Sequence, residues 1–409
     1  MYSRQRFPAL VARGKGIFFE TIENKPSLIF KTLIAIFLTL LAALPVFGQT
    51  GKPVALEQSE IHGGIEIGSK GVKGIAIRVS GAEEGYEVKI LYAEVINTTL
   101  MQTKDNKFTP EAIRDTAAAA QRLFRRMQQE YSIPPEDIHL VVSSGAIAEN
   151  PQELIAELRK RMGQAPAFLD VDSEVQLTIA GAIPKRYRAN GRWFDNRSLS
   201  VLIDIGSGNT KGGYQQARQV AFGKAENDYV TWGIPKGTVT YTNEIFKTTG
   251  EATDYPTFAK RAQALSNDVL RIPLRNEAAR RPGLINRKKV YLSGGIIWAV
   301  ATLLHPEDRR SFTPLTIEDF NNFYNRAITN PEALLNPDLS RITNSALRQD
   351  AEREVESVRN TFTPKNLIAG AEILRAVSTE MNLAGKRLLF ARFGHLAWIL
   401  SYVRLQAEN

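Results

Sequence analysis

The sequence contains no cysteine and only four histidines, and these absences remove several kinds of chemistry. Disulfides, thiolate nucleophiles, cysteine metal sites and a lipid anchor on cysteine are excluded. The histidines, His62, His139, His305 and His395, are scattered without metal-ligand spacing, so we interpret them as packing or surface residues. The net charge is +9, yet the chain has no long basic block and no nucleic-acid-binding motif. We therefore predict no nucleic-acid partner.

Long hydrophobic runs are also missing, apart from one near the N-terminus. A basic leader precedes the apolar residues 32–44, and small residues up to Gly48 suit cleavage before Gln49. This run is shorter than the roughly 20 apolar residues of a membrane-spanning helix. We predict that residues 1–48 are an export signal, with an uncleaved N-terminal membrane anchor as the alternative. Either interpretation places the rest of the chain outside the cytoplasm, in the periplasm or secreted.

Two segments share a strand, loop, strand pattern around an acid. In residues 64–74 the acid is Glu66, and in residues 202–213 it is Asp204. Apolar residues precede each acid, isoleucine and glycine follow it, and a basic residue closes each loop. Glycine allows backbone N–H groups to approach a phosphate closely. The matched pair predicts an internal duplication whose two loops face a shared phosphate-binding cleft.

Strand and helix signals alternate along the rest of the chain, which predicts an α/β fold with mixed sheets. Thr109-Pro110 and Asn150-Pro151 are typical helix starts, and residues 138–142 form an apolar strand between them. We predict a linker over residues 49–60, a first lobe over 61–186 and a second lobe over 198–386. Residues 387–409 are predicted to form a helix that packs back on a lobe.

Three motifs then occur in a fixed order: the Asp204 loop, the Ile-Pro-Lys-Gly turn at 234–237, and the Ser-Gly-Gly turn at 293–295. On these motifs the chain, from about residue 61 to its C-terminus, resembles the exopolyphosphatase and guanosine pentaphosphate phosphohydrolase (Ppx/GppA) family. That family belongs to the actin, sugar kinase and Hsp70 superfamily. The resemblance implies two actin-like (ribonuclease H-like) lobes around an interlobe cleft.

The resemblance also implies a set of functional residues. Glu174, in the segment 170–177, falls on the family's general base, which activates water against a terminal phosphate; without the resemblance it would only start a helix. Asp204 and Glu66 would hold Mg²⁺ through water, and loop N–H groups would take up charge on the phosphate. The candidate substrate-binding residues lie on the glycine turns. They are Gly68, Ser69, Lys70, Lys73, Gly206, Ser207, Gly208, Asn209, Lys211, Gly294 and Gly295.

Several positions depart from the family pattern. The first loop has Glu66 where the family has aspartate, and Lys70 where it has asparagine. The second loop has Lys211 where the family has a glutamate that organises metal and water. An arginine expected after the serines at 143–144 is missing, with Ile147 near that place. The new lysines, Lys70 and Lys211, either bind phosphate directly or project into solvent, and the sequence leaves both interpretations open.

Three functions follow as hypotheses. The first is an exported phosphohydrolase that removes terminal phosphate from polyphosphate, or from another phosphoanhydride, by Mg²⁺-assisted water attack. The second is a catalytically impaired protein of the same fold that binds or senses phosphate or polyphosphate. The third is an ATP-dependent assembly protein, because residues 208–211 also resemble a loop of plasmid-segregation actins; export argues against it. A membrane contact is expected only with an uncleaved anchor, and a homodimer is left open.

Overall fold

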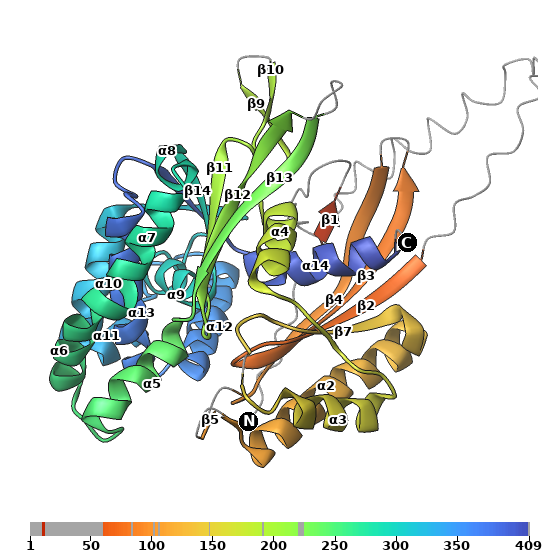
Figure 1. Ribbon diagram of the computed structural model, residues 1–409, viewed down its shortest axis with the longest axis horizontal. Coiled ribbons are helices and arrows are strands. Elements are labelled where there is room, and N and C mark those ends of the chain that lie inside the picture. Colours follow the sequence, from red (N-terminus) through yellow and green to blue (C-terminus); the bar gives the residue numbers. More distant parts are fainter. Residues whose placement is uncertain are drawn as a thin grey trace, which may run out of the picture.

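The computed structural model describes residues 10–12, 60–82, 85–100, 103–104, 107–146, 148–189, 192–219 and 225–407 (Figure 1). The apolar run at 32–44 and almost all of the predicted linker lie outside these residues. None of the helices that are described is both long and apolar enough to cross a membrane. The described chain forms two lobes, each built on a six-stranded mixed sheet.

The first sheet has the strand order β1-β4-β3-β2-β7-β8. The strands are β1 (Leu10–Ala12), β2 (Glu60–Ile67), β3 (Gly71–Ala82), β4 (Gly85–Asn97), β7 (Ile138–Val142) and β8 (Ala167–Phe168). Strands β2, β3 and β4 form an antiparallel meander, and β1 pairs antiparallel with β4. Strands β7 and β8 continue the sheet in parallel from β2.

The second sheet has the order β13-β12-β11-β14-β16-β15. The strands are β11 (Ser200–Ile205), β12 (Thr210–Gln219), β13 (Ala225–Ile234), β14 (Lys289–Ser293), β15 (Phe312–Leu315) and β16 (Arg387–Ala391). Here too an antiparallel meander, β11 to β13, is followed by two parallel strands, β14 and β16. This shared topology confirms the predicted α/β fold of two lobes, and it agrees with the predicted duplication. Two short ribbons, β5 (Thr103–Lys104) with β6 (Lys107–Phe108) and β9 (Arg186–Ala189) with β10 (Arg192–Asp195), complete the strands described.

The outer face of the first sheet is covered by α2 (Pro110–Tyr131) and α3 (Pro151–Met162). As predicted, the Thr109 side chain caps α2 by accepting a hydrogen bond from the Ala112 N–H at 3.2 Å. The predicted cap at Asn150 differs, because no side-chain bond caps α3. The Asn150 amide instead pairs with the backbone N–H and carbonyl of Phe108, at 2.8 and 3.1 Å. A short 3₁₀ turn, Pro135–Asp137, precedes β7.

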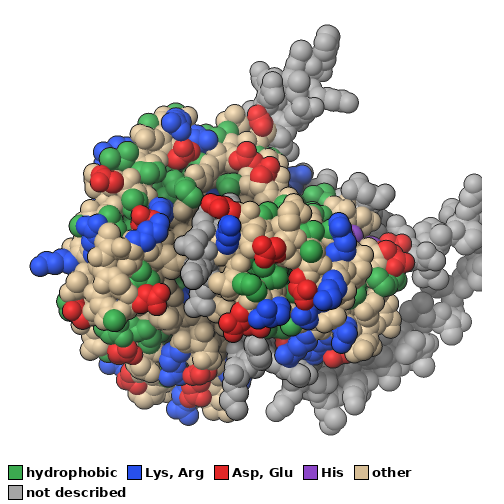
Figure 2. Space-filling model, turned by 60° about the horizontal axis from the view of Figure 1, so that its bottom comes forward, with side chains coloured by type: hydrophobic (Ala, Val, Ile, Leu, Met, Phe, Trp, Pro, Cys, Tyr) green, Lys and Arg blue, Asp and Glu red, His purple; other side chains and the backbone are tan. Residues whose placement is uncertain are grey.

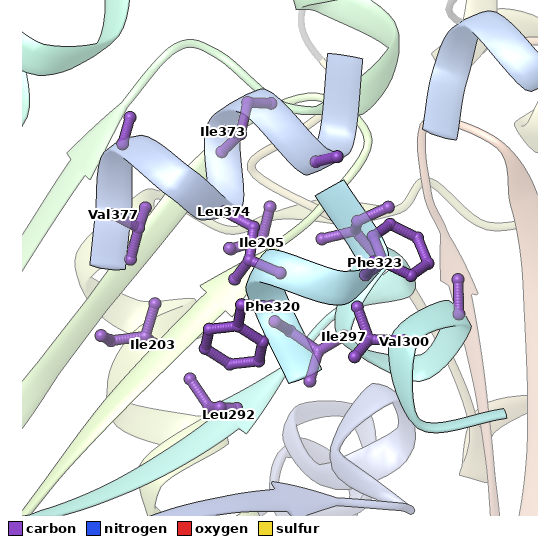
Figure 3. Close-up of a cluster of buried hydrophobic side chains, with 14 of the residues drawn as sticks. Ile203, Ile205, Leu292, Ile297, Val300, Phe320, Phe323, Ile373, Leu374 and Val377 are labelled. Atoms are coloured by element: carbon purple, nitrogen blue, oxygen red, sulfur yellow. The ribbon is translucent and has the colours of Figure 1, made fainter. Parts of the chain in front are cut away.

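The outer side of the second lobe is helical. Its helices are α5 (Thr238–Thr249), α6 (Tyr255–Ser266), α7 (Ile272–Arg280), α8 (Gly283–Asn286), α9 (Gly295–Leu304), α10 (Ile317–Thr329), α11 (Pro331–Leu335), α12 (Ser345–Thr361) and α13 (Pro364–Glu380), with a π-helical turn at Asn267–Arg271. Figure 3 shows the core that they form with the sheet, where Ile203 and Ile205 of β11 meet Phe320 and Leu374.

The two inner helices exchange lobes. Helix α4 (Val171–Ala182) follows the first sheet but packs on the second, where Val175 and Ile179 contact Leu202. Helix α14 (Gly394–Ala407) follows the second sheet but packs on the first, where Ile399 contacts Ile75. The two helices lie side by side between the sheets (Figure 1). Consecutive layers of the molecule are therefore helices, sheet, α14, α4, sheet and helices.

The predicted C-terminal helix over 387–409 is corrected at its start. Residues 387–391 form β16, which pairs with β14 in the second sheet, and only residues 394–407 are helical. The run after Arg387 is entirely apolar, and a short buried run has no period that separates strand from helix. The helix does pack back on a lobe, which is the first one.

Candidate functional site

Alternation along β11 points Asp204 towards the layer between the lobes. Successive side chains of a strand point to opposite faces of the sheet. Ile203 and Ile205 enter the core of the second lobe, whereas Leu202 packs against α4. Asp204 shares the face of Leu202 and therefore lies on the α4 side.

Glu66 is placed in the same way by β2. Ile65 and Ile67 pack against the outer helices of the first lobe. Gly64, on the opposite face, lies under α14, because a Cβ at this position would come 2.4 Å from the Val403 side chain. Glu66 shares that face. The two predicted acids thus approach the inner layer from opposite sheets.

Glu174 lies in the first turn of α4, which Asp170 caps by accepting a hydrogen bond from the Ser173 N–H at 2.7 Å. Glu174 is only 3% exposed. Its Oε2 accepts a hydrogen bond from the Ser144 N–H at 2.8 Å and another from the Ser143 hydroxyl at 3.2 Å. Its Oε1 lies 2.6 Å from the Nζ of Lys211. The predicted base is therefore held at the loop after β7, paired with a lysine from the second sheet.

The ammonium group of Lys211 is surrounded by protein oxygen atoms. Besides Glu174, it donates to Asn209 Oδ1 at 3.2 Å and Ser144 Oγ at 3.3 Å, and Asp204 Oδ2 lies 3.7 Å away. Lys211 is only 3% exposed. The interpretation that Lys211 projects into solvent is thus wrong, and direct phosphate binding by Lys211 stays a prediction. The side chain neither projects into solvent nor presents a free charge to a ligand.

The pair of Glu174 and Lys211 is ionised. Burial by itself raises the pKa of Glu174, but the charge and hydrogen bond of Lys211 outweigh it, so the pKa lies below its usual range. Burial likewise lowers the pKa of Lys211, but Glu174 and Asp204 outweigh it and raise that pKa. A carboxylate and an ammonium group therefore share one buried site at neutral pH.

A second acid and lysine pair lies on the first hairpin. Lys73 donates to Glu66 Oε1 at 2.8 Å and to the backbone carbonyl of His395 at 3.0 Å. Glu66 Oε2 is buried, and within the described chain no hydrogen-bond partner reaches it. Burial raises the pKa of Glu66 to about 7 in spite of Lys73. Each predicted metal ligand thus has a lysine beside it.

Lys70 connects the first hairpin loop to the second lobe. Its Nζ donates to the Thr361 carbonyl at the end of α12 and to Asn366 Oδ1 in the first turn of α13, both at 2.8 Å. The ammonium group also lies 5.1 Å from the centre of the Phe362 ring. Burial lowers the pKa of Lys70 to about 8. As with Lys211, the interpretation that the side chain projects into solvent is wrong, because Lys70 bonds to protein, and direct phosphate binding stays a prediction.

The glycine turns meet at the same place. The N–H of Gly68 bonds to the Gly71 carbonyl, and that of Gly206 to the Asn209 carbonyl, both at 2.9 Å. The Ser69 hydroxyl donates to the Gly145 carbonyl at 2.7 Å, and the Asn209 amide donates to Ser144 Oγ at 3.1 Å.

Other parts of the second lobe pack against the 206–209 loop and the end of β11. The Ser207 carbonyl accepts the N–H of Val239 at 2.9 Å. Gly294 adopts a φ of 98°, which favours glycine, and a Cβ there would lie 2.2 Å from the Ile205 carbonyl oxygen. Gly295 lies against the Phe362 ring. The structure thus brings the predicted site residues of both lobes into one region, whereas Ile147 falls outside the residues described.

Four contributors were missed from the sequence: Ser144, Thr361, Phe362 and Asn366. One signal was present for the lysine pairs. Lys73 follows Glu66 by seven residues, Lys211 follows Asp204 by seven, and each lysine is the cross-strand partner of its acid in the sheet register. That spacing in a hairpin predicts direct contact.

The residues present do not fit the Mg²⁺ ion that the resemblance implies. Within the ranges described, no group of three or more histidine, aspartate or glutamate side chains could hold a metal ion. The acids predicted to do so are paired with Lys73 and Lys211. An ammonium group beside these carboxylates repels a divalent cation.

Comparisons with known proteins support the fold. No protein-family model matches the sequence, and no significant match was found among curated proteins. Among solved structures, a Ppx/GppA family member from Aquifex aeolicus is similar, with a TM-score of 0.53 and 15% identity over 86% of this chain and 100% of that one. An exopolyphosphatase from Cytophaga hutchinsonii has a TM-score of 0.57 and 13% identity, over 85% and 98% of the two chains. An exopolyphosphatase-like protein has a TM-score of 0.55 and 17% identity, over 85% and 99%. At these identities the likeness concerns the fold, and the chain therefore has the two-lobed, phosphohydrolase-like fold of the Ppx/GppA proteins.

Proposed function

We propose that this protein binds a phosphate or polyphosphate chain between its lobes without hydrolysing it. The observation that carries the proposal is the 2.6 Å contact between Glu174 Oε1 and Lys211 Nζ. A general base must reach a water molecule and accept its proton. Glu174 has its Oε1 on Lys211 and its Oε2 on Ser144, and its pKa is held low, so it is a poor proton acceptor in this state.

The class of ligand rests on the glycine turns and on the solved structures with this fold. Two of those structures are described as an exopolyphosphatase and an exopolyphosphatase-like protein. The turns that begin at Gly68 and Gly206 lie at the lobe boundary, and we propose that an anionic chain end is held beside them. On the face shown in Figure 2, basic and acidic side chains are mixed over both lobes. We therefore propose that binding takes place at these turns.

The test uses the protein from residue 49 onwards, mixed with long-chain polyphosphate and Mg²⁺. Binding is measured by isothermal titration calorimetry, and turnover by phosphate release. We expect binding without release, and weaker binding after Gly208→Ala, which alters the turn without removing a charge. Absence of binding to both polyphosphate and inorganic phosphate would refute the proposal.

A second candidate, exopolyphosphatase activity, is favoured by the position of Glu174. Its carboxylate touches the loop at Ser143 and Ser144, beside the glycine turns of both lobes. If Lys211 leaves Glu174 when a ligand enters, the carboxylate becomes free to act as a base. Phosphate release by the wild type that Glu174→Gln abolishes would support this candidate. Release that appears only after Lys211→Glu would instead show that the lysine suppresses it.

We also propose that the protein works outside the cytoplasm. The support is the basic leader followed by the apolar run at residues 32–44. Fusion of alkaline phosphatase after residue 60 reports export by its activity, because that enzyme needs disulfides formed outside the cytoplasm. N-terminal sequencing of the exported protein then distinguishes cleavage near Gly48 from a retained anchor.

A further inference from the structure

We propose that the ammonium group of Lys211 is a built-in cation that takes the place of a divalent metal ion between the lobes. The protein would then hold its two inner carboxylates together, and accept an anionic ligand, without any metal. This inference rests on the geometry around Lys211 and does not need the proposed ligand to be correct.

The first support is the set of atoms around Lys211 Nζ. Four oxygen atoms from three separate parts of the chain converge on it, at 2.6 to 3.7 Å: two from the β11–β12 hairpin, one from the loop after β7 and one from α4. Convergence of oxygen atoms from distant segments is how proteins bind a hard cation such as Mg²⁺ or Mn²⁺. Here the chain supplies the cation itself.

The second support is the balance of charge at this site. Lys211 lies against two carboxylates, those of Glu174 and Asp204, and is almost completely buried. A buried carboxylate needs a compensating charge, because leaving it unpaired in a low dielectric is costly. Lys211 supplies that charge, whereas a metal ion added beside the ammonium group would be repelled.

The third support is that the arrangement is repeated in the other lobe. In the first hairpin, Lys73 is the cross-strand partner of Glu66 and donates to its carboxylate at 2.8 Å. In the second, Lys211 is the cross-strand partner of Asp204. An acid paired with a cross-strand lysine is therefore a feature of both hairpins.

The experiment measures Mn²⁺ binding to the purified chain by electron paramagnetic resonance, with thermal unfolding as a second readout. Mn²⁺ is the probe because free and bound ions give different spectra. We expect the wild type to have no Mn²⁺ site at Asp204, so Asp204→Asn should leave its Mn²⁺ binding unchanged. We expect Lys211→Ala to gain Mn²⁺ binding, at least tenfold tighter than the wild type, and to be stabilised by Mn²⁺. The double variant Lys211→Ala, Asp204→Asn should lose that gain.

The control is Lys247→Ala, which removes an exposed lysine that also pairs with a carboxylate, that of Glu244. It should leave Mn²⁺ binding as in the wild type. Wild-type binding that Asp204→Asn or Glu174→Gln abolishes would overturn the inference, as would a folded Lys211→Ala that gains nothing. If Lys211→Ala does not fold, the inference is tested by comparing Mn²⁺ binding of the wild type with that of Asp204→Asn. Failure of polyphosphate binding would refute the proposed function and leave this result unchanged.

Discussion

Gly208 of the second lobe lies directly against Gly145 of the first, so close that a Cβ on Gly208 would come 2.0 Å from the Gly145 carbonyl oxygen. The same carbonyl accepts the hydroxyl of Ser69 at 2.7 Å. This contact joins loops of both lobes next to the pair of Glu174 and Lys211. Only glycine allows the two backbones to approach in this way.

Replacement of Gly208 by alanine should therefore force the loops apart. We expect a loss of about 1–3 kcal/mol in the free energy of unfolding, as for other overpacked contacts. Faster hydrogen exchange in the first turn of α4 should accompany it. Gly206→Ala is the matched control, because its Cβ would meet at closest the Asn209 carbonyl oxygen, at 3.2 Å within the same loop. Equal effects of the two changes would contradict a contact between lobes.

Lys211→Met should destabilise the protein strongly. Removing one partner of a buried ion pair typically costs about 3–5 kcal/mol, because the other charge stays buried and unpaired. The double variant Lys211→Met, Glu174→Gln should recover much of that loss, which a double-mutant cycle by urea unfolding measures. Lys247→Met, whose side chain is 70% exposed, should cost at most about 1 kcal/mol. Additive effects of the two buried changes would argue against the pair.

Low pH should weaken the same pair. The pKa of Glu174 in the folded state lies below its ordinary value of 4.5, because burial, which raises it, is outweighed by Lys211. The stabilisation is therefore complete above that ordinary pKa and is lost as the pH falls through the folded-state value. Unfolding midpoints of the wild type and Glu174→Gln, measured from neutral to acidic pH, should converge as the pH falls. A constant difference would contradict the shift.

Lys70 gives a second pH dependence, of the same sign, in alkali. Burial lowers its pKa from 10.5 to about 8, so between these values the unfolded chain binds more protons than the folded one. The contribution of this group to the free energy of unfolding must then rise with pH, by up to about 1.4 kcal/mol per pH unit. Lys70→Met should lack this rise, so the free energy of unfolding of the wild type should increase relative to that of the variant through the same window. Urea unfolding of both proteins measures it, with Lys247→Met as control.

Gly181→Ala should displace α4 from α14. A Cβ on Gly181 would lie 2.2 Å from the Ala397 carbonyl oxygen, which belongs to rigid helix backbone. We expect a lower melting temperature and a loss of polyphosphate affinity, because Glu174 is carried by the same helix. Leu177→Ala tests a second contact between the two helices, because Leu177 of α4 packs against the apolar cluster that includes Ile399 of α14. A second substitution that restores the melting temperature of Gly181→Ala but not its polyphosphate affinity would show that Gly181 positions Glu174 as well as stabilising the fold.

The strands and caps around the site could be predicted because their signals are local. The apolar run before each acid, the glycine turn after it and the threonine cap at Thr109 act within a few residues. The matched loops then indicated the duplication, which the sheet topology repeats. These local signals predicted an α/β fold, whereas the two actin-like lobes were implied by the resemblance to the Ppx/GppA family.

The directions of Lys70 and Lys211 could not be predicted, because each depends on a distant segment. Lys70 bonds to Thr361 and Asn366, which lie about three hundred residues further along the chain. Lys211 meets Glu174 only because α4 crosses to the second sheet. The strand at 387–391 was missed for a similar reason. Its own sequence pattern does not distinguish strand from helix, and its pairing with β14 makes it a strand.

The exchange of α4 and α14 has a consequence for biosynthesis. The residues of α14 that cover Ile75 and Val141 are synthesised long after the first sheet, because the whole second sheet lies between them in the chain. Until then, the inner face of the first sheet is an apolar surface with nothing on it, and such surfaces favour aggregation of nascent chains. The first lobe is thus completed only when α14 has been made, and we expect a chain that stops before α14 to need a chaperone to stay in solution.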